Sequence, residues 1–135
     1  MKKYPINIHF SIHWGDMDAL GHVNHVRYIT WFETARCELF RKIGLGSVGQ
    51  PEVGPILVNV QANYKAPVVF PADLIVSCRV SKFGNTSFVL EYMIAHAHEP
   101  EKVVADGSSV VVLINYKTGQ TIPIPDWLKQ AVEKL

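Results

Sequence analysis

The sequence predicts an α+β domain in which a mainly antiparallel sheet of about five strands packs against one long helix. Residues 6–14 alternate between apolar and polar side chains, which is the period of a half-buried strand. Residues 25–43 carry apolar side chains at three- and four-residue spacing, as an amphipathic helix does. Four later segments are rich in β-branched and aromatic residues and are separated by short turns, which favours antiparallel pairing.

Each element has its own signal in the sequence. The apolar positions of the first strand are Ile6, Ile8, Phe10, Ile12 and Trp14. Those of the long helix are Ile29, Phe32, Ala35, Leu39 and Ile43. Glu33, Arg36, Arg41 and Lys42 fall elsewhere on the helical wheel. Gly44 suits the left-handed residue that ends many helices, and "GLGSVGQPEVGP" after the helix predicts a turn-rich crossover loop.

The four later strands are predicted at "ILVNVQANY", "DLIVSCRVSKF", "SFVLEYMIAHA" and "KVVADGSSVVVLINY". The closing "PDWLKQAVEKL" predicts a short helix with Asp126 as its cap and with Trp127, Ala131 and Leu135 turned inward. One long helix cannot cover both faces of such a sheet. Two of the strand segments carry large apolar groups at odd and even positions, so we expect an oligomer to complete the burial.

Composition limits the kinds of protein this can be. The 135 residues, of which 48% are hydrophobic, predict a single domain over residues 1–135. The formal charge of +1, with both signs interspersed, gives no footprint for nucleic acid or an anionic membrane. Two cysteines, Cys37 and Cys78, and a start without a signal-peptide core favour a cytoplasmic protein. No apolar run approaches the roughly 20 residues that span a bilayer.

The stretch "HWGDMDALGHVNHVRYITWF", residues 13–32, gathers aspartates and histidines at a junction between strand and helix. Free backbone N–H groups and the helix dipole make a helix N-terminus suited to an oxygen on which negative charge develops. A carboxylate beside it can attack or activate water, which makes Asp18 and His25 the candidates. Asn24 is most simply a helix cap, Gly21 a turn residue with positive φ, and Asp16 a solvated carboxylate or local hydrogen-bond acceptor.

Other chemistries fit this stretch less well. Asp16, Asp18, His22 and His25 are nominal metal ligands, but no HExxH or paired CxxC spacing is present, so we expect no metal. A GxSxG elbow is absent, and "KFGNTS" lacks the spacing of a phosphate-binding loop.

The segment "WGDMDALGHVNHVRYITWFETAR" matches a D-x-D-x-x-G-x-V-x-x-x-x-Y signature followed by an aromatic- and acid-bearing helix. Further matches are "ANYKAPVVFPADLIV", "SFVLEY", "VADGSSVVVLIN" and "GQTIPIP". In these motifs the chain resembles the hotdog-fold acyl-CoA thioesterases of the 4-hydroxybenzoyl-CoA thioesterase type. The resemblance implies a hotdog fold, with the sheet wrapped around the long helix, and homodimers or homotetramers without metal or organic cofactor.

The resemblance also implies roles for individual residues. Asp18 is the catalytic carboxylate, as nucleophile or general base, and the backbone amide at about His25 binds the thioester carbonyl oxygen. The His25 side chain orients substrate or assists proton transfer. The expected substrate-binding residues are Gly21, Asn24, Tyr28, Lys82 and Ser87. Basic residues that some members place before the fourth strand are missing from "FGNTSF", where Lys82 is the nearest cation.

The predicted activity is hydrolysis of an acyl-CoA, or of an acyl-phosphopantetheine on a carrier protein, to free acid and thiol. Two alternatives remain open. A hotdog hydratase or dehydratase would use an Asp/His pair as acid and base, although its H-x-P-x-x-P-G pattern is absent here. A non-catalytic acyl-thioester-binding module is the other alternative, because fold does not fix function.

Overall fold

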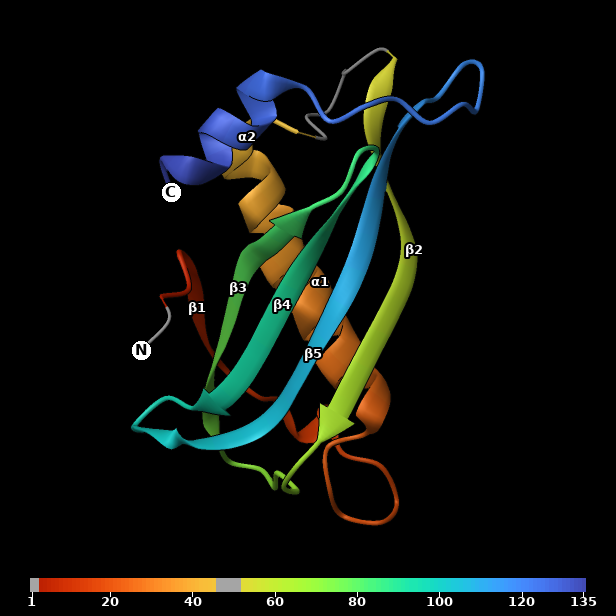
Figure 1. The fold of residues 1–135 in the computed structure, drawn as a ribbon. Coiled ribbons are helices and arrows are strands. Elements are labelled where there is room, and N and C mark those ends of the chain that lie inside the picture. Colours follow the sequence, from red (N-terminus) through yellow and green to blue (C-terminus); the bar gives the residue numbers. More distant parts are fainter. Residues whose placement is uncertain (1–2, 46–51) are drawn as a thin grey trace.

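A computed structural model describes residues 3–45 and 52–135 as one sheet with a long helix laid across one of its faces (Figure 1). The order of elements is β1 (Ile6–Ser11), a 3-10 turn (Trp14–Asp16), α1 (His25–Ile43), β2 (Val53–Tyr64), β3 (Asp73–Phe83), β4 (Ser87–His96), β5 (Glu99–Asn115) and α2 (Asp126–Glu133). The five strands lie in the order β1-β3-β4-β5-β2, and every neighbouring pair is antiparallel. The predicted α+β class and antiparallel sheet are therefore confirmed.

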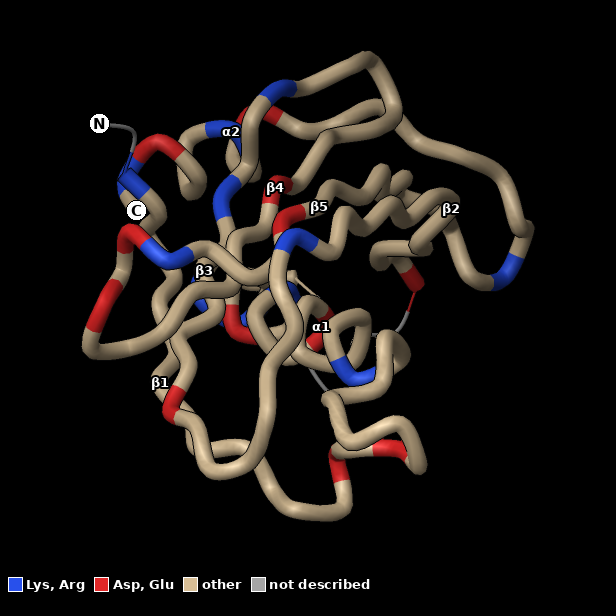
Figure 2. The backbone as a smooth tube through the Cα atoms, turned by 90° about the horizontal axis from the view of Figure 1, so that it is seen from below, with Lys and Arg blue, Asp and Glu red and all other residues tan. Residues whose placement is uncertain are grey.

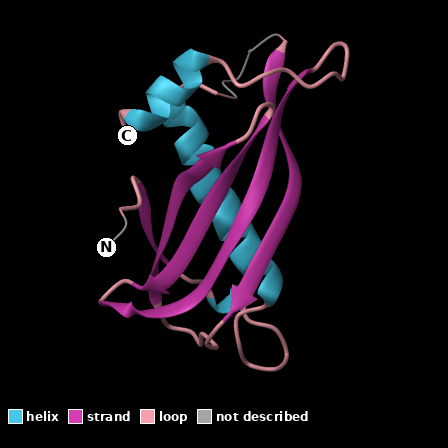
Figure 3. Cartoon of the chain, in the orientation of Figure 1, coloured by secondary structure: helices cyan, strands magenta, loops and turns pink. Residues whose placement is uncertain are grey.

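The sheet curves around α1, which covers the central strands and leaves β2 at an open edge (Figure 3). The core between helix and sheet is apolar: Phe32 stacks on Tyr92 with ring centroids 4.6 Å apart, and Leu39 is fully buried. At the far end of α1, α2 packs through Leu128, which is also fully buried. In the part of the chain that the structure describes, no helix is long and apolar enough to cross a membrane.

The predicted bounds of α1 are confirmed at both ends. Asn24 is its N-cap, and Gly44 ends it in the left-handed conformation at φ 81°. Arg36, which the helical wheel places off the apolar stripe, is nevertheless buried with 9% of its surface exposed. Its guanidinium donates to the Tyr92 hydroxyl (3.1 Å), which shares a 2.6 Å hydrogen bond with Ser109. This network satisfies polar groups beneath the helix.

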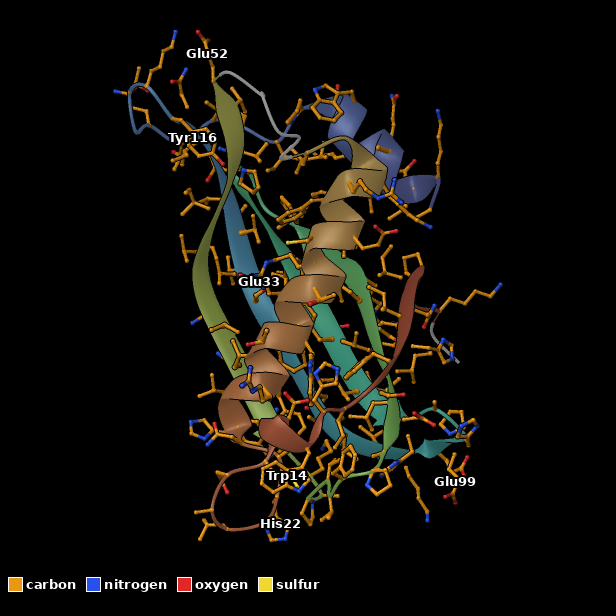
Figure 4. All side chains as sticks on the ribbon, turned by 180° about the vertical axis from the view of Figure 1, so that it is seen from behind. Trp14, His22, Glu33, Glu52, Glu99 and Tyr116 are labelled. Atoms are coloured by element: carbon orange, nitrogen blue, oxygen red, sulfur yellow. The ribbon has the colours of Figure 1, made fainter. Side chains whose placement is uncertain are left out.

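The first strand is shorter than the alternation predicts. It ends at Ser11, and Trp14 belongs to the 3-10 turn with 71% of its surface exposed. The cause is local, because the Asp16 carboxylate accepts a hydrogen bond from the His13 backbone amide (2.7 Å) and pulls the chain into a turn. Trp14 lies with His22 at the end of the molecule where α1 begins (Figure 4).

Two strands begin earlier than predicted, and part of one predicted loop cannot be compared. β2 starts at Val53 and β5 at Glu99. Pro55 is tolerated because β2 is an edge strand, where the missing N–H costs no ladder bond. Residues 46–51 of the predicted crossover loop lie outside the described residues.

The prediction for α2 is wrong in its cap and in two of its three inward residues, Trp127 and Leu135, whereas Ala131 does pack against the core. Pro125 is the N-cap, and Asp126 is the first helical residue without a side-chain capping bond. Trp127 is 52% exposed and Leu135 is 38% exposed, whereas Leu128 is buried. The inward stripe of a helix that starts at Asp126 is Leu128, Ala131 and Val132, at the spacing that one helical face requires.

Candidate active site

Asp16 organises the chain just before α1. Beyond its bond to the His13 amide, its carboxylate pairs with the Arg27 guanidinium (Oδ1 to Nε, 3.3 Å). Its backbone carbonyl accepts a hydrogen bond from the Asn24 amide at 3.0 Å. Asp16 thus acts as the local hydrogen-bond acceptor that the sequence predicted, and it fixes the approach of the chain to the helix.

A tight turn follows and carries Asp18. The Asp18 amide donates to the His22 carbonyl (3.1 Å), and the Gly21 amide donates to the Asp18 carbonyl (3.0 Å). Gly21 has φ 83°, a left-handed conformation that glycine adopts at little cost. The predicted positive φ at Gly21 is therefore confirmed, and the turn holds Asp18 beside the start of α1.

The Asp18 carboxylate is exposed and accepts one hydrogen bond at each of its two oxygens. Its Oδ1 accepts from the Leu20 backbone amide (2.9 Å) and its Oδ2 accepts from the Asn24 side-chain amide (3.0 Å). These bonds, the Leu20 amide first and the Asn24 side chain second, lower the pKa of Asp18 below its ordinary value. The group is therefore an anion at neutral pH, which a nucleophile or a general base must be.

The N-terminus of α1 presents a free donor next to this carboxylate. Asn24 caps the helix by accepting from the Val26 amide (2.9 Å), which confirms its predicted role as cap. The His25 amide, one residue earlier than Val26, donates to no acceptor among the residues that the structure describes. It is one of the orphan N–H groups of a helix start, and the helix dipole adds to its attraction for a developing oxyanion.

An open pocket of about 400 Å³ lies at the same helix end. Its lining residues are His22, Val23, His25, Tyr28, Tyr64, Lys65, Ala66 and Pro67. The ring of Tyr28 meets that of Tyr64 edge-on at 5.3 Å, and burial raises the pKa of Tyr28. The Tyr64 hydroxyl donates to the His25 carbonyl at 3.3 Å. The sequence analysis does not name Tyr64 and Lys65 as site residues, although both lie in the family match "ANYKAPVVFPADLIV".

A larger pocket, of about 650 Å³, lies elsewhere and does not contain this chemistry. Its residues include Tyr4 and the strand residues Ile75, Arg79 and Met93, which by strand alternation point away from α1. Its Arg79 already pairs with Glu91, so that charge is satisfied. The smaller pocket is the candidate active site because His25 and Tyr28 at the start of α1 line it; Asp18, Gly21 and Asn24 lie next to these residues and are not part of its lining.

Lys82 and Ser87 do not join Asp18 within one chain. They flank the turn between β3 and β4, at the end of the sheet where α1 finishes (Figure 1). The nominal metal ligands do not converge either, since Asp16 pairs with Arg27 while Asp18 is held by Leu20 and Asn24. Over residues 3–45 and 52–135, no three His, Cys, Asp or Glu side chains form a cluster that could hold a metal ion.

Comparison with known proteins identifies the family. The sequence model of the Thioesterase-like superfamily matches residues 12–132, which is most of the chain. The chain belongs to the Thioesterase-like superfamily. The predicted membership of a thioesterase family is thereby confirmed, and with it the hotdog fold, which the solved structures of thioesterases share with this chain; the 4-hydroxybenzoyl-CoA type stays a prediction.

The individual relatives are distant in sequence, but their similarity extends over nearly the whole length of this chain. The long-chain acyl-CoA thioesterase FadM of Escherichia coli is 27% identical over 121 residues, covering 88% of this chain and 90% of FadM. The 1,4-dihydroxy-2-naphthoyl-CoA hydrolase of Synechococcus is 26% identical, covering 91% and 86% of the two chains. A thioesterase superfamily structure from Jannaschia superposes with a TM-score of 0.87 at 28% identity, covering 96% and 81%.

Proposed function

We propose that this protein is an acyl-CoA thioesterase that hydrolyses an acyl-CoA or acyl-phosphopantetheine thioester to the free acid and thiol. One observation carries the proposal: an ionised, exposed carboxylate, Asp18, is tied through Asn24 to a helix start whose His25 amide is free. The names of the relatives, a long-chain acyl-CoA thioesterase and a 1,4-dihydroxy-2-naphthoyl-CoA hydrolase, support the same reaction class.

The reaction needs few groups. The His25 amide binds the thioester carbonyl oxygen and stabilises the negative charge that develops on it. Asp18 then either attacks the carbonyl carbon, forming an acyl-enzyme anhydride that water cleaves, or takes a proton from a water molecule that attacks directly. In both routes the C–S bond breaks, the thiolate leaves and takes up a proton, and one water is consumed. The His25 side chain orients substrate or assists the proton transfer.

The substrate lies between two chains in this proposal. Gly21, Asn24 and Tyr28 contribute from the chain that holds Asp18, whereas Lys82 and Ser87 contribute from its neighbour, because in their own chain they lie at the opposite end of the sheet. The β2 edge supports such pairing. It exposes large apolar side chains, each with 37–56% of its surface accessible: Ile56, Leu57, Val58, Val60 and Tyr64. An unpaired apolar edge of this length favours association, as a homodimer or as a homotetramer of two dimers.

The protein acts on a small molecule and without metal or organic cofactor. Lys, Arg, Asp and Glu are scattered over the fold without a block of one sign (Figure 2), which fits neither nucleic acid nor a membrane surface as partner. Cys37 and Cys78 are both free, which suits the reducing cytoplasm.

A panel of acyl-CoAs assayed for thiol release tests the activity. The panel spans aliphatic chains of increasing length and hydroxylated aromatic acyl groups, and each substrate is run with wild type and with Asp18→Asn. Release by wild type that is lost in the variant supports the proposal. Hydration of an enoyl-CoA without thiol release would replace it with the hydratase function, and binding without turnover by wild type would replace it with a binding module.

Subunit mixing tests whether the site is shared. An Asp18→Asn chain is mixed with a chain carrying Lys82→Ala and Ser87→Ala, and the subunits are allowed to exchange. A mixed dimer would hold one intact site, so an equal mixture should recover about a quarter of wild-type activity if dimers form at random. A fully active monomer in light scattering at assay concentration would overturn the shared site.

A further inference from the structure

Resting on the proposed function, we infer that Asn24 is a positioning residue that fixes the Asp18 carboxylate relative to the His25 amide. Asn24 links both parts of the site: its side chain binds Asp18, and its backbone leads directly into the amide of His25, which has no acceptor among the described residues. A helix cap is its evident role, but a cap needs only an oxygen acceptor, and Asn24 uses both ends of its amide.

The orientation of the Asn24 amide follows from its partners. Its Oδ1 accepts from the Val26 N–H (2.9 Å), and its Nδ2 donates to Asp18 Oδ2 (3.0 Å). Turning the amide over would place Nδ2 against an N–H and Oδ1 against a carboxylate, so both contacts would be repulsive. The two bonds therefore select one rotamer and hold the carboxylate at a set place beside the helix start.

The backbone of Asn24 is anchored independently of its side chain. Its amide donates to the Asp16 carbonyl and its carbonyl accepts from the Arg27 amide, both at 3.0 Å. The ion pair between Arg27 and Asp16 also joins the first turn of α1 to the segment that precedes it. A rigid support of this kind is what a residue needs if it is to position a reacting group, because misplacement by about 1 Å can cost 10²-fold in rate.

Other capping residues would not reproduce this link. Serine accepts the bond from the N2 or N3 amide nearly as well as asparagine, but it is too short to reach Asp18 as well. Aspartate also caps well, but it would place a second carboxylate against Asp18, and like charges at that distance raise a pKa. Asn24→Ser and Asn24→Asp therefore keep the cap while removing the link, whereas Asn24→Ala removes both.

The charges around Asp18 are few, so its titration reports on the link. His22, in the same turn, is the titratable group whose charge acts on Asp18, and it lowers the pKa. On the packed elements, Asp16 pairs with Arg27, and Lys65 of the pocket wall pairs with Asp106. The remaining titratable side chains of the pocket are those of His25, Tyr28 and Tyr64.

The test compares the three variants with wild type by pH–rate profile, melting temperature and carboxyl ¹³C NMR. The Asp18 signal is assigned by its loss in Asp18→Asn. In Asn24→Ser we expect kcat to fall roughly 10- to 100-fold with little change in KM. The pKa of Asp18 rises because a donor to its ionised form is lost, so activity disappears at a higher pH on the acid side. In Asn24→Asp we expect this acid-side loss of activity at a still higher pH.

Melting temperature separates positioning from capping. Asn24→Ser and Asn24→Asp should melt close to wild type, whereas Asn24→Ala melts lower and loses rate as Asn24→Ser does. Asn7→Ser is the matched control. The side chain of Asn7, in β1, accepts a hydrogen bond from the Ser77 hydroxyl of β3 at 2.7 Å. This substitution should leave kcat and the pH–rate profile unchanged. Asn24 is a cap only, and the inference is overturned, if Asn24→Ser keeps the wild-type kcat, the wild-type acid side of the pH–rate profile and the wild-type pKa of Asp18 by NMR.

The outcomes also separate this inference from the proposed function. Should wild type hydrolyse no acyl-CoA of the panel, the proposed function fails. The NMR titration would still show whether Asn24 controls the ionisation of Asp18, because that readout needs no turnover.

Discussion

The two ends of α1 are finished in opposite ways. At the C-terminal end the carbonyls of Phe40 and Arg41 are satisfied: the Gly44 amide donates to both, and the Leu45 amide donates to the Phe40 carbonyl (2.8 Å). Leu45 is buried, and Leu128 of α2 packs over this end. This end is closed by hydrogen bonds and by apolar contacts.

The N-terminal end is left open. Its cap, Asn24, satisfies the Val26 amide, but the His25 amide has no acceptor among the described residues, and Asp18 stands exposed beside it. An unsatisfied donor next to an ionised carboxylate adds little to stability. If the proposed function holds, α1 carries stability at one end and chemistry at the other, and substitutions at the two ends should separate these properties.

The largest effect is expected at the open end. Asp18→Asn should lower kcat by about 10³-fold or more, because it removes the nucleophile or base, while the melting temperature stays close to that of wild type. Steady-state thiol release and thermal unfolding measure the two quantities. Asp16→Asn is the matched control: it should cost far less in rate, and a larger loss there than at Asp18 would show that Asp18 is not the catalytic carboxylate.

The closed end should respond in stability alone. Leu128→Ala removes a fully buried side chain and should lower the free energy of unfolding by about 2–5 kcal/mol, as large-to-small core substitutions do. Urea denaturation measures the loss, and kcat of the folded fraction should stay at the wild-type value. A parallel fall in kcat would mean that packing at the far end of α1 sets the geometry of the site.

His25→Ala tests how much the backbone amide and the side chain of His25 each contribute to kcat. The substitution keeps the amide and removes the imidazole, so kcat should fall by roughly 10- to 10³-fold, the range of a general acid–base contribution. An unchanged kcat would leave the amide as the sole contributor of this residue. Complete loss of turnover in a folded variant would instead favour an Asp/His acid–base pair, as in a hydratase.

The sequence predicts the closed parts of the fold better than the contacts within the site. Apolar periodicity places α1 at His25–Ile43, because the spacing records which face is buried, and richness in β-branched and aromatic residues places β3 at Asp73–Phe83. Asn24 and Gly44 are identified by the backbone chemistry of helix ends. Asp18 is singled out by its place in the junction and by the family motif.

Contacts between distant segments leave no such record. Arg36 is polar, so a wheel places it outward, and its burial depends on Tyr92, which is 56 positions away in the sequence. Tyr64 and Lys65 form one wall of the pocket, and they lie at the end of β2, far along the chain from the start of α1. For α2 the sequence predicts the helix but not its cap or its whole inward face, since a difference of one residue in the start of a short helix changes which side chains face inward.

The smallest expected effects come from two glycines with the same backbone conformation at opposite ends of α1. Gly44 and Gly21 have φ of 81° and 83°, and no atom of the neighbouring residues that the structure describes comes closer than 4.0 Å to a Cβ added at either. Alanine should therefore cost about 1 kcal/mol of unfolding free energy at both positions, through backbone strain and not through crowding.

Their effect on rate should differ. Gly21→Ala distorts the turn that holds Asp18, so kcat should fall with stability, whereas Gly44→Ala should leave kcat unchanged. Gly15→Ala is the control, because Gly15 has open space and no positive φ, and it should change neither stability nor rate. Urea denaturation and thiol release measured on the same preparations decide the matter. An equal loss of kcat in Gly44→Ala would mean that the closed end of the helix transmits strain to the site, and the division between the two ends would not hold.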